Sequence, residues 1–395
     1  FEVQRATVKN ERGQNYDNRP YGLAFEKTLE ALFPYGHPYS WSTIGYIDDL
    51  NRVDVGDLKR FFLRWYGPNN ATLTVAGDVK PADVITYAEK YFGPIPRGPE
   101  VKNIQKQVAA LAQDRYISYE DNIRFPMLMV TYPSVPAYDK DEAALDALAS
   151  ILAEDKNSIF YQNFVKKQMA YDASVSNYSA EVAGMFIVQV RSLPDKAKTT
   201  NPKEPFYNSL AETEVLMKSC FAEFEKKGIT DEDLKKFKAN YESGAIRSLS
   251  SVRGKGAQLA ANQTFTGNAN QMSKDMERYM KITKEDVMRV YNQYIKGKSA
   301  VYLSVVPKGK TNIAAKVTDF DPPKKNPEDG KESAEYTNLI YNKAKDNFDR
   351  SQKPAGGANP VVKVPDFWTE NFPNGMKLIG MKNDEIPTVN ITVSM

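Results

Sequence analysis

The sequence predicts an α+β fold of tandem homologous domains, each a mainly antiparallel sheet with helices packed on one face. Two observations lead to this prediction. Helix-type and strand-type segments follow one another along most of the chain, and one helix-turn-strand segment occurs twice. The length of 395 residues exceeds a single typical hydrophobic core, so we expect more than one domain.

Hydrophobic periodicity and the punctuation by Pro and Gly define the individual elements. Helices are predicted over residues 1–14, 22–33, 53–67, 81–93 and 139–155. Strands are predicted over 70–79 and 126–135, and residues 171–193 have the pattern of a β-hairpin. The helix over 53–67 is expected to be capped at Asp54 and to end at Gly67-Pro68.

An internal repeat sets the domain limits. Residues 54–77 align without gaps with residues 283–306. The matched pairs are Asp57 with Asp286, Arg60 with Arg289, Phe62 with Tyr291, Trp65 with Tyr294 and Ala71 with Ala300. One such match can arise by chance, but its order and chemistry favour duplication. Residues 103–308 then form a complete second copy, and 1–102 form the C-terminal half of a first copy.

The rest of the chain differs in composition. Residues 309–366 are rich in Pro, Gly, Lys and Asp, which is typical of a linker, and we expect one short helix around 333–348. Residues 367–395 contain an Asn-Gly turn between two strand-type runs. They are predicted to be the first strands of a third homologous domain.

Composition excludes several classes of function. The 53 Lys+Arg and 50 Asp+Glu residues give a net charge of +3, and no basic stripe is interleaved with aromatic residues, so no nucleic-acid partner is expected. No apolar run reaches the length of a membrane span. Cys220 is the single cysteine and His37 the single histidine, so the chain cannot complete a zinc site from these residue types. His37 lies in a Gly/Pro turn, where a packing role is favoured.

Several stretches resemble the insulinase/pitrilysin family of zinc metallopeptidases, whose inverted motif is HxxEH. "QRATVKNERGQNYDNRPYG", "HPYSWSTIGYIDDLNRVDVGDLKRFFLRWYGPNNATLTVAGDV" and "AEKYFGPIP" resemble the second half of its catalytic domain. "SIFYQNFVKKQMAYDASVSNYSAEVAGMFIV" is similar to its second, non-catalytic domain. The resemblance covers nearly all of residues 1–308.

The resemblance implies a role for one carboxylate. In this family the HxxEH helix supplies two His ligands and a Glu base, and a later helix supplies a glutamate as the third zinc ligand. Glu11 in "VKNER" matches that glutamate, although an unmatched helix-end acid would normally be solvated. The family often has a second glutamate seven residues earlier; here that position is Gln4, which hydrogen-bonds but brings no charge.

The HxxEH sequence is absent from this chain, so no catalytic residue is assigned. The helix expected at the corresponding place in the second copy, around 141–153, contains no histidine, and the second copy is therefore expected to be non-catalytic. In the family, an Arg and a Tyr of a non-catalytic domain hold the substrate backbone. Tyr171 matches that Tyr, with Lys166 near the place of the Arg; a strand-end core aromatic is the alternative for Tyr171.

The resemblance implies part of a zinc endopeptidase that hydrolyses peptides or unfolded protein segments in a chamber between homologous domains. This chain alone is expected to be inactive and to bind no zinc ion tightly. Its partners would be the remaining domains of its own chain or a homologous subunit. An exported location, for instance the periplasm, is favoured over the cytoplasm by resemblance. The alternatives are a non-catalytic structural or peptide-binding member of the family, and a generic peptide-binding α/β module that shares only the fold.

Overall fold

The computed structural model describes residues 1–323, 334–353, 355–359, 361 and 363–394. The chain divides into two units. The first comprises Phe1–Phe62, Val101–Ala239 and Ser273–Asn338. The second comprises Leu63–Glu100, Asn240–Met272 and Leu339–Met395.

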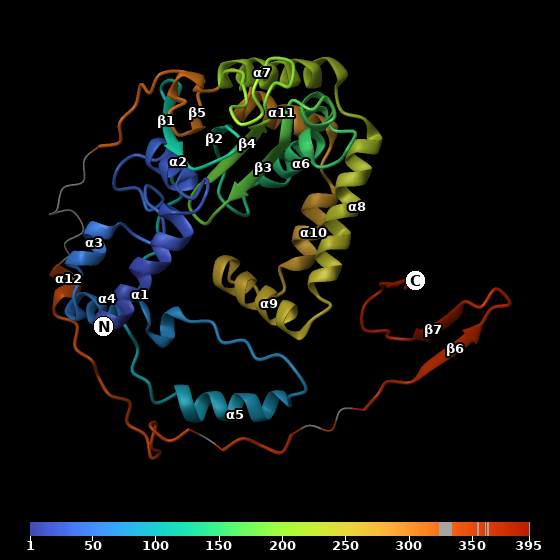
Figure 1. The fold of residues 1–395 in the computed structure, drawn as a ribbon. Coiled ribbons are helices and arrows are strands. Elements are labelled where there is room, and N and C mark those ends of the chain that lie inside the picture. Colours follow the sequence, from blue (N-terminus) through green and yellow to red (C-terminus); the bar gives the residue numbers. More distant parts are fainter. Residues whose placement is uncertain (324–333, 354, 360, 362, 395) are drawn as a thin grey trace. The chain divides into compact units, whose positions relative to one another are not determined.

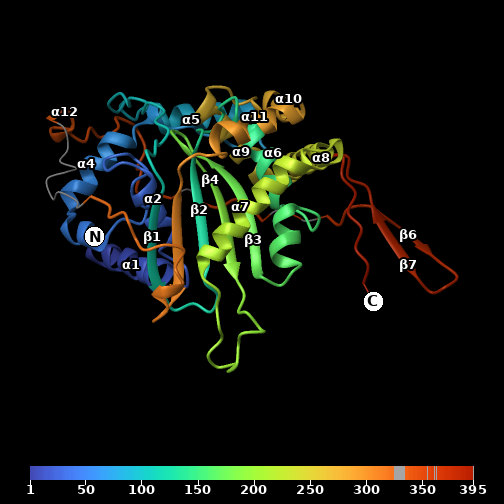
Figure 2. The same cartoon turned by 90° about the horizontal axis from the view of Figure 1, so that it is seen from above.

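The first unit contains a five-stranded sheet with the order β1-β5-β2-β4-β3 (Figures 1 and 2). Its strands are β1 (Arg115–Asp121), β2 (Met127–Ser134), β3 (Ala170–Ser179), β4 (Gly184–Ser192) and β5 (Val301–Pro307). Only the β1–β5 pair is parallel; β5–β2, β2–β4 and β4–β3 are antiparallel. The sheet is therefore mainly antiparallel, and the predicted strand at 126–135 and hairpin at 171–193 are confirmed.

The two faces of this sheet are covered by different parts of the chain. Met127 and Met129 of β2, with alternate residues of β5, share a core cluster with α2 (Ala24–Leu32). Because side chains alternate along a strand, the intervening residues point to the opposite face. There they meet α6 (Glu142–Ala153), α7 (Leu210–Lys227) and α11 (Lys284–Tyr294).

The predicted α+β class is confirmed, with one addition. Helices α6, α7 and α11, which lie within residues 103–308, pack on one face of the sheet, as expected. The other face is covered by α2, which precedes the predicted second copy. Residues from both predicted copies therefore contribute to a single core.

The repeated helices begin in the same way. At the start of α11, the Asp286 N–H donates to Thr283 Oγ1 (3.1 Å), and the Thr283 N–H donates to Asp286 Oδ2 (3.1 Å). At the start of α4 (Val55–Trp65), the Asp57 N–H donates to Asp54 Oδ1 (2.9 Å), and the Asp54 N–H donates to Asp57 Oδ2 (2.9 Å). These reciprocal bonds form a capping box, which satisfies backbone donors that a helix start leaves free. The helix predicted at 53–67 is confirmed, with its expected cap.

The helices predicted over 1–14, 22–33, 81–93 and 139–155 are present, and further helices occur that were not predicted. The N-terminal helix is α1 (Glu2–Arg12), which continues into a π-helical turn, η1 (Gly13–Asp17). The remaining elements of the chain are α3 (Ile47–Arg52), η2 (Pro68–Asn70), α5 (Pro81–Phe92), η3 (Tyr161–Val165), α8 (Asp231–Ser248), α9 (Val252–Thr266), α10 (Met272–Met280), η4 (Thr311–Ile313) and α12 (Ala334–Thr337).

The first residues of the predicted linker form a strap along the outer edge of β1. The Asp319 N–H donates to the Tyr116 carbonyl (2.9 Å), and the Tyr116 N–H donates to Asp319 Oδ1 (2.7 Å). Ile313 is buried, and the Arg115 guanidinium lies 4.2 Å from the centre of the Phe320 ring. The strap, residues 311–320, therefore covers an edge of the sheet that would otherwise expose free backbone groups.

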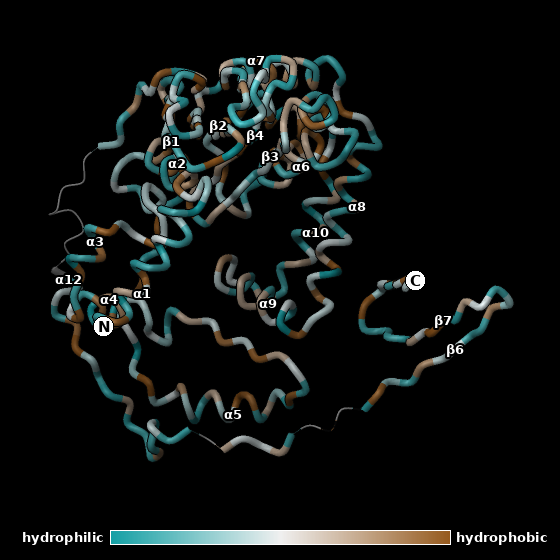
Figure 3. Tube along the Cα trace, viewed as in Figure 1, coloured by the Kyte–Doolittle hydropathy of each residue, from teal (hydrophilic) through white to brown (hydrophobic). Residues whose placement is uncertain are grey.

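In the second unit, the strand predicted at 70–79 is absent, so that prediction was wrong. Residues 71–76 have no regular secondary structure, whereas the matching residues 300–305 contain most of β5. β5 has a neighbouring strand on each side, but no residue between 1 and 114 lies in a strand. A single strand-type sequence without partners does not form a strand. Leu73, Val75 and much of α5 are consequently exposed, and Figure 3 shows hydrophobic residues along this helix.

The C-terminal segment contains β6 (Phe367–Asn371) and β7 (Lys377–Met381), which pair as an antiparallel hairpin with Gly375 at a φ of 86° in its turn. The two strand-type runs and the turn are thus confirmed. The helix predicted around 333–348 is much shorter. Residue 333 lies outside the described residues, and α12 ends at Thr337. Tyr336 of α12 is buried, whereas Ile340 and Tyr341 after it are exposed, so the later residues lack the packing that most helices need for stability.

We expect Asp319→Ala to loosen the strap, because the Tyr116 N–H loses its acceptor and Lys316 loses an ion pair of 3.1 Å. Trypsin cleavage after Lys316 should become several-fold faster, reflecting a loss of about 1 kcal/mol. Asp321→Ala removes an equally acidic but exposed side chain and should leave the cleavage rate unchanged. Equal rates for both variants would contradict the role of Asp319.

Candidate functional site

Glu11 lies on the last turn of α1, and its side chain is exposed. It makes no hydrogen bond or ion pair with any residue that the structure describes. Gln4 is exposed on the same helix, and a separation of seven residues places it about 10 Å away along the axis. The helix therefore presents a free carboxylate and a free amide on one side, without direct contact between them.

The neighbouring residue, Arg12, fixes the end of α1. Its guanidinium donates to both carboxylate oxygens of Glu26 on α2, from Nη1 at 2.8 Å and from Nη2 at 3.0 Å. Nη1 also donates to the Gly45 carbonyl (2.7 Å), and Ser42 Oγ donates to Glu26 Oε2 (2.7 Å). Arg12 is 6% exposed and Glu26 2% exposed. A forked ion pair of this geometry determines both distance and orientation, so the backbone of Glu11 is held against α2.

The charges of this pair reinforce each other. Burial alone would raise the pKa of Glu26, but the hydrogen bonds from Arg12 and Ser42 and the charge of Arg12 lower the pKa overall. The hydrogen bond to Glu26 raises the pKa of Arg12, against the opposing effect of its burial. Both groups are therefore charged at neutral pH.

His37 has a packing role, as the sequence favoured. It is buried, and its Nε2 lies 3.0 Å from the Gln107 carbonyl, to which it donates. Its Nδ1 accepts from the Tyr39 N–H (3.0 Å), and the ring stacks on Phe33 with centroids 4.5 Å apart. Because both ring nitrogens are used, His37 has no free atom for a metal ion or for proton transfer.

Tyr171 and Lys166 have different surroundings. Lys166 follows η3, is exposed, and donates to Gln162 Oε1 (2.9 Å). Tyr171 is on the edge strand β3, is 57% exposed, and stacks on Phe125 with centroids 5.3 Å apart. The structure records no contact between Lys166 and Tyr171.

The cation next to Tyr171 is instead Arg191, which the sequence analysis missed. Its guanidinium lies 5.1 Å from the centre of the Tyr171 ring and 5.8 Å from that of Tyr21. The register of β3 and β4 pairs Arg191 with Asp172, and its Nε donates to Asp172 Oδ1 (2.8 Å). The signal was present, since extending the predicted hairpin by its register places these opposite charges across from each other.

Tyr21 joins this cluster to the N-terminal region. Its N–H donates to Asp121 Oδ2 (2.7 Å), and its hydroxyl donates to the Phe125 carbonyl (2.6 Å). Tyr21, Arg191, Tyr171 and Phe125 thus form a stacked ladder at one end of the sheet. Stacking of this kind restricts the rotation of the Tyr171 ring, whereas none of the residues that the structure describes accepts a hydrogen bond from its hydroxyl.

Helix α6 lies where the second copy would have its HxxEH helix, and its acids are all engaged in packing. Glu142 accepts from Arg278 Nη1 (2.8 Å), Asp146 accepts from the Tyr279 hydroxyl (2.5 Å), and the neighbouring Asp141 accepts from the Tyr294 hydroxyl (2.8 Å). Burial raises the pKa of Glu142 and of Asp146. These contacts hold α10 and α11 to α6, which is a structural role.

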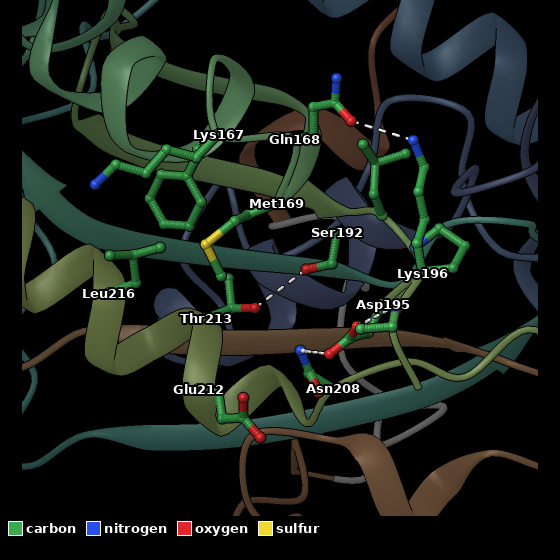
Figure 4. Close-up of a pocket in the computed structure, with 14 residues that line it drawn as sticks. Lys167, Gln168, Met169, Ser192, Asp195, Lys196, Asn208, Glu212, Thr213 and Leu216 are labelled. Carbon is green, nitrogen blue, oxygen red and sulfur yellow. Dashed lines mark hydrogen bonds between the residues drawn. The ribbon is translucent and has the colours of Figure 1, made fainter. Parts of the chain in front are cut away.

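A pocket of about 330 Å³ lies between the turn before β3, the end of β4 and the start of α7 (Figure 4). Most of its polar groups are bonded to one another. Lys196 donates to Gln168 Oε1 (3.1 Å), Ser192 and Thr213 share a hydrogen bond of 3.1 Å, and Asn208 donates to Asp195 (3.3 Å). This pocket therefore presents few free donors or acceptors to a ligand.

Parts of the chain are similar in sequence to known peptidases. Residues 52–241 match the family model described as the peptidase M16 inactive domain. The chain is 28% identical over 308 residues to the zinc protease PqqE of Helicobacter pylori, a match that covers 75% of this chain and 64% of that protein. These matches make the chain similar to insulinase-like M16 peptidases over residues 52–241 and to a zinc protease over most of its length. The chain spans slightly less than two thirds of PqqE.

Solved M16-type structures share the fold. A protease from Helicobacter pylori matches with a TM-score of 0.66 and 24% identity over 78% of this chain and 71% of that one. The peptidase M16 inactive domain from Pseudomonas fluorescens matches with a TM-score of 0.63 and 19% identity, over 78% of this chain and 70% of that one. The periplasmic protease PqqL from Escherichia coli matches with a TM-score of 0.55 and 12% identity, over 77% of this chain and 33% of that one. At these identities the matches concern the fold alone.

The buried ion pair of Arg12 and Glu26 leads to a prediction about stability. Arg12→Met leaves the Glu26 carboxylate buried with Ser42 as its remaining partner and should cost about 3–5 kcal/mol in the free energy of unfolding. The double variant Arg12→Met/Glu26→Leu removes the unpaired charge and should recover most of that loss. Urea unfolding of both variants tests this, with Glu2→Gln on the exposed part of α1 as a control of small effect.

The effect of Arg12→Met should also depend on pH. Since the pKa of Glu26 is lowered in the folded state, the pair stabilises the protein above the ordinary glutamate value of 4.5. This contribution is lost as the pH falls through the folded pKa. The difference between the wild-type chain and Arg12→Met should therefore shrink below about pH 4.5. A difference that stays constant down to pH 3 would contradict the ion-pair account.

Proposed function

We propose that this chain is part of a zinc-dependent endopeptidase that hydrolyses peptides or unfolded protein segments in a chamber formed between homologous domains. The match to the peptidase M16 inactive domain and the similarity to the zinc protease PqqE support a peptidase. The chain spans 64% of that relative, so the activity is assigned to an intact protein that contains this chain.

The observation that carries the proposal is the state of Glu11. An exposed carboxylate usually gains little from a fixed backbone, yet here the adjacent Arg12 is buried in a forked ion pair. The side chain of Glu11 is left free at a defined position on α1. Carboxylate oxygens are zinc ligands, and a ligand is most effective when it is held in place before the ion binds. We assign Glu11 as the third metal ligand.

On this proposal, this chain alone does not hold zinc tightly. Among the residues that the structure describes, no three or more His, Cys, Asp or Glu side chains are grouped so that they could hold a metal ion. The other ligands would come from an HxxEH helix, which this sequence does not contain. Gln4, about two turns earlier on the same side of α1, is assigned to hydrogen-bond near the ion rather than to bind it.

Tyr171 is assigned to contact the peptide substrate. Its hydroxyl is free, and its ring is restrained by Phe125 and Arg191. Arg191 is better suited than Lys166 to act beside it, because Arg191 contacts the ring and Lys166 does not. Since Arg191 is bonded to Asp172, it positions Tyr171 and is not itself assigned to bind substrate.

For location we propose an exported protein. The M16-type structure PqqL is described as periplasmic, and that description concerns PqqL. No helix in the described part of this chain is both long and apolar enough to cross a membrane.

A non-catalytic structural or peptide-binding member of the family is the second candidate. It is favoured by the family model that matches, which is that of the inactive domain. The two candidates differ in a simple observation: the first requires an HxxEH sequence in the intact protein, and the second does not.

Equilibrium dialysis of this 395-residue chain against zinc should give no tight stoichiometric site, because one free carboxylate cannot complete the coordination. Tight one-to-one binding that His37→Ala abolishes would show that the histidine had been misassigned.

In the intact protein, Glu11→Gln keeps the shape of the side chain but removes its negative charge. Zinc content and peptidase activity should then fall together. The free energy of unfolding should stay within about 0.5 kcal/mol of the parent, as for other surface substitutions. Glu2→Gln, at the other end of α1, should change neither zinc content nor activity. Full zinc occupancy in Glu11→Gln would exclude Glu11 as a ligand.

A further inference from the structure

A second pocket, of about 410 Å³, lies against the turn between β3 and β4. One side is formed by residues between 16 and 43, and the other by residues between 178 and 185. Its aromatic side chains are Tyr16, Phe25, Phe33, Tyr39, Trp41 and Tyr178. We refer to it as the aromatic pocket.

The aromatic pocket has no charged side chain in its lining. The pocket of Figure 4 contains Lys167, Asp195, Lys196 and Glu212. The apolar floor of the aromatic pocket includes Leu29, Ala183 and Met185, which belong to the hydrophobic core of the first unit. A neutral lining of this kind favours a neutral, apolar ligand, because a charged group would lose its hydration without gaining a partner.

Hydrogen bonds and ring contacts hold the walls of the aromatic pocket in place. The Tyr39 hydroxyl accepts from the Val182 N–H (3.2 Å), and the Tyr39 N–H is bonded to His37. Phe33 is stacked on His37, and Phe25 meets Tyr178 edge-on with centroids 6.3 Å apart. A pocket whose walls are already fixed loses little entropy when a ligand enters.

The rim is open to solvent. Phe25 and Trp41 are each 43% exposed, and Tyr178 is 52% exposed. Three large aromatic rings left partly exposed around one concave site are more than scattered surface hydrophobicity and are typical of a binding site.

We propose that the aromatic pocket binds one aromatic or large aliphatic side chain of a peptide. The peptide character of the ligand rests on the proposed function, and the choice of side chain rests on the neutral aromatic lining. Binding would cover the exposed rings of Phe25, Trp41 and Tyr178. The site is assembled from residues on both sides of position 102, so it exists only when the two predicted copies are packed together.

The test uses the 395-residue chain and a neutral peptide of glycine and serine with one central p-benzoylphenylalanine. After illumination, mass spectrometry should locate the cross-links at residues of the aromatic pocket. Ala180→Leu, which fills the pocket without removing a ring, should reduce the labelling about tenfold or more, as expected for losing the burial of one large apolar side chain. Phe206→Ala removes an exposed ring outside the pocket and should leave the labelling unchanged.

Phe25→Ala and Trp41→Ala provide independent variants if Ala180→Leu fails to fold, and both should weaken labelling. N-acetyl-tryptophanamide should compete, and a peptide with aspartate at the central position should not. Labelling that survives all three variants, or stronger competition by dodecanoate than by N-acetyl-tryptophanamide, would overturn the proposal. Because no zinc is present in these measurements, their failure is distinct from a failure of the Glu11 assignment.

Discussion

The geometry of the N-terminal region depends on the buried pair of Arg12 and Glu26. Burying two charges is costly, and a well-packed apolar pair of similar volume would often be as stable or more so. The pair is better understood as a constraint on geometry. An apolar contact allows α1 to rotate or slide, whereas a forked ion pair with further bonds to Ser42 and Gly45 permits a single arrangement.

This constraint extends to the sheet. Glu26 belongs to α2, and α2 covers the face of the sheet that α6, α7 and α11 leave open. Tyr21 adds two hydrogen bonds to Asp121 and Phe125. The predicted repeat would divide the chain near residue 102, but the packing crosses that position. The first 62 residues and the sheet share one hydrophobic core.

Local signals in the sequence were sufficient for most elements. The cap at Asp54, the strand β2 and the turn before β7 depend on neighbours within a few residues, and all were predicted correctly. The strand at 70–79 failed because strand formation needs partners, which local sequence does not contain. The helix predicted around 333–348 was too long at its C-terminal end, because α12 ends at Thr337 and residues 338–348 are not helical.

In the candidate site, too, local sequence indicated some residues, whereas the contacts that depend on the fold were missed. Glu11 was predicted as a ligand because it matches a motif of five residues, and the structure places it on a helix, as the resemblance implies. The anchoring by Arg12 could not be found, since its partner Glu26 lies on another helix and its other contacts lie in a turn. Lys166 was chosen by distance along the chain. Arg191 reaches Tyr171 through the pairing of β4 with β3, which spacing alone does not reveal.

The position of β5 has a consequence for how the protein is made. β5 lies between β1 and β2, yet it is the last of the five strands to leave the ribosome. Until residues 301–307 are available, β1 has no partner strand and β2 has one free edge. Such contacts between distant residues form slowly, and unpaired edges promote aggregation. The growing chain must therefore keep an open sheet soluble, and synthesis past residue 307 becomes the step that commits it to the native state.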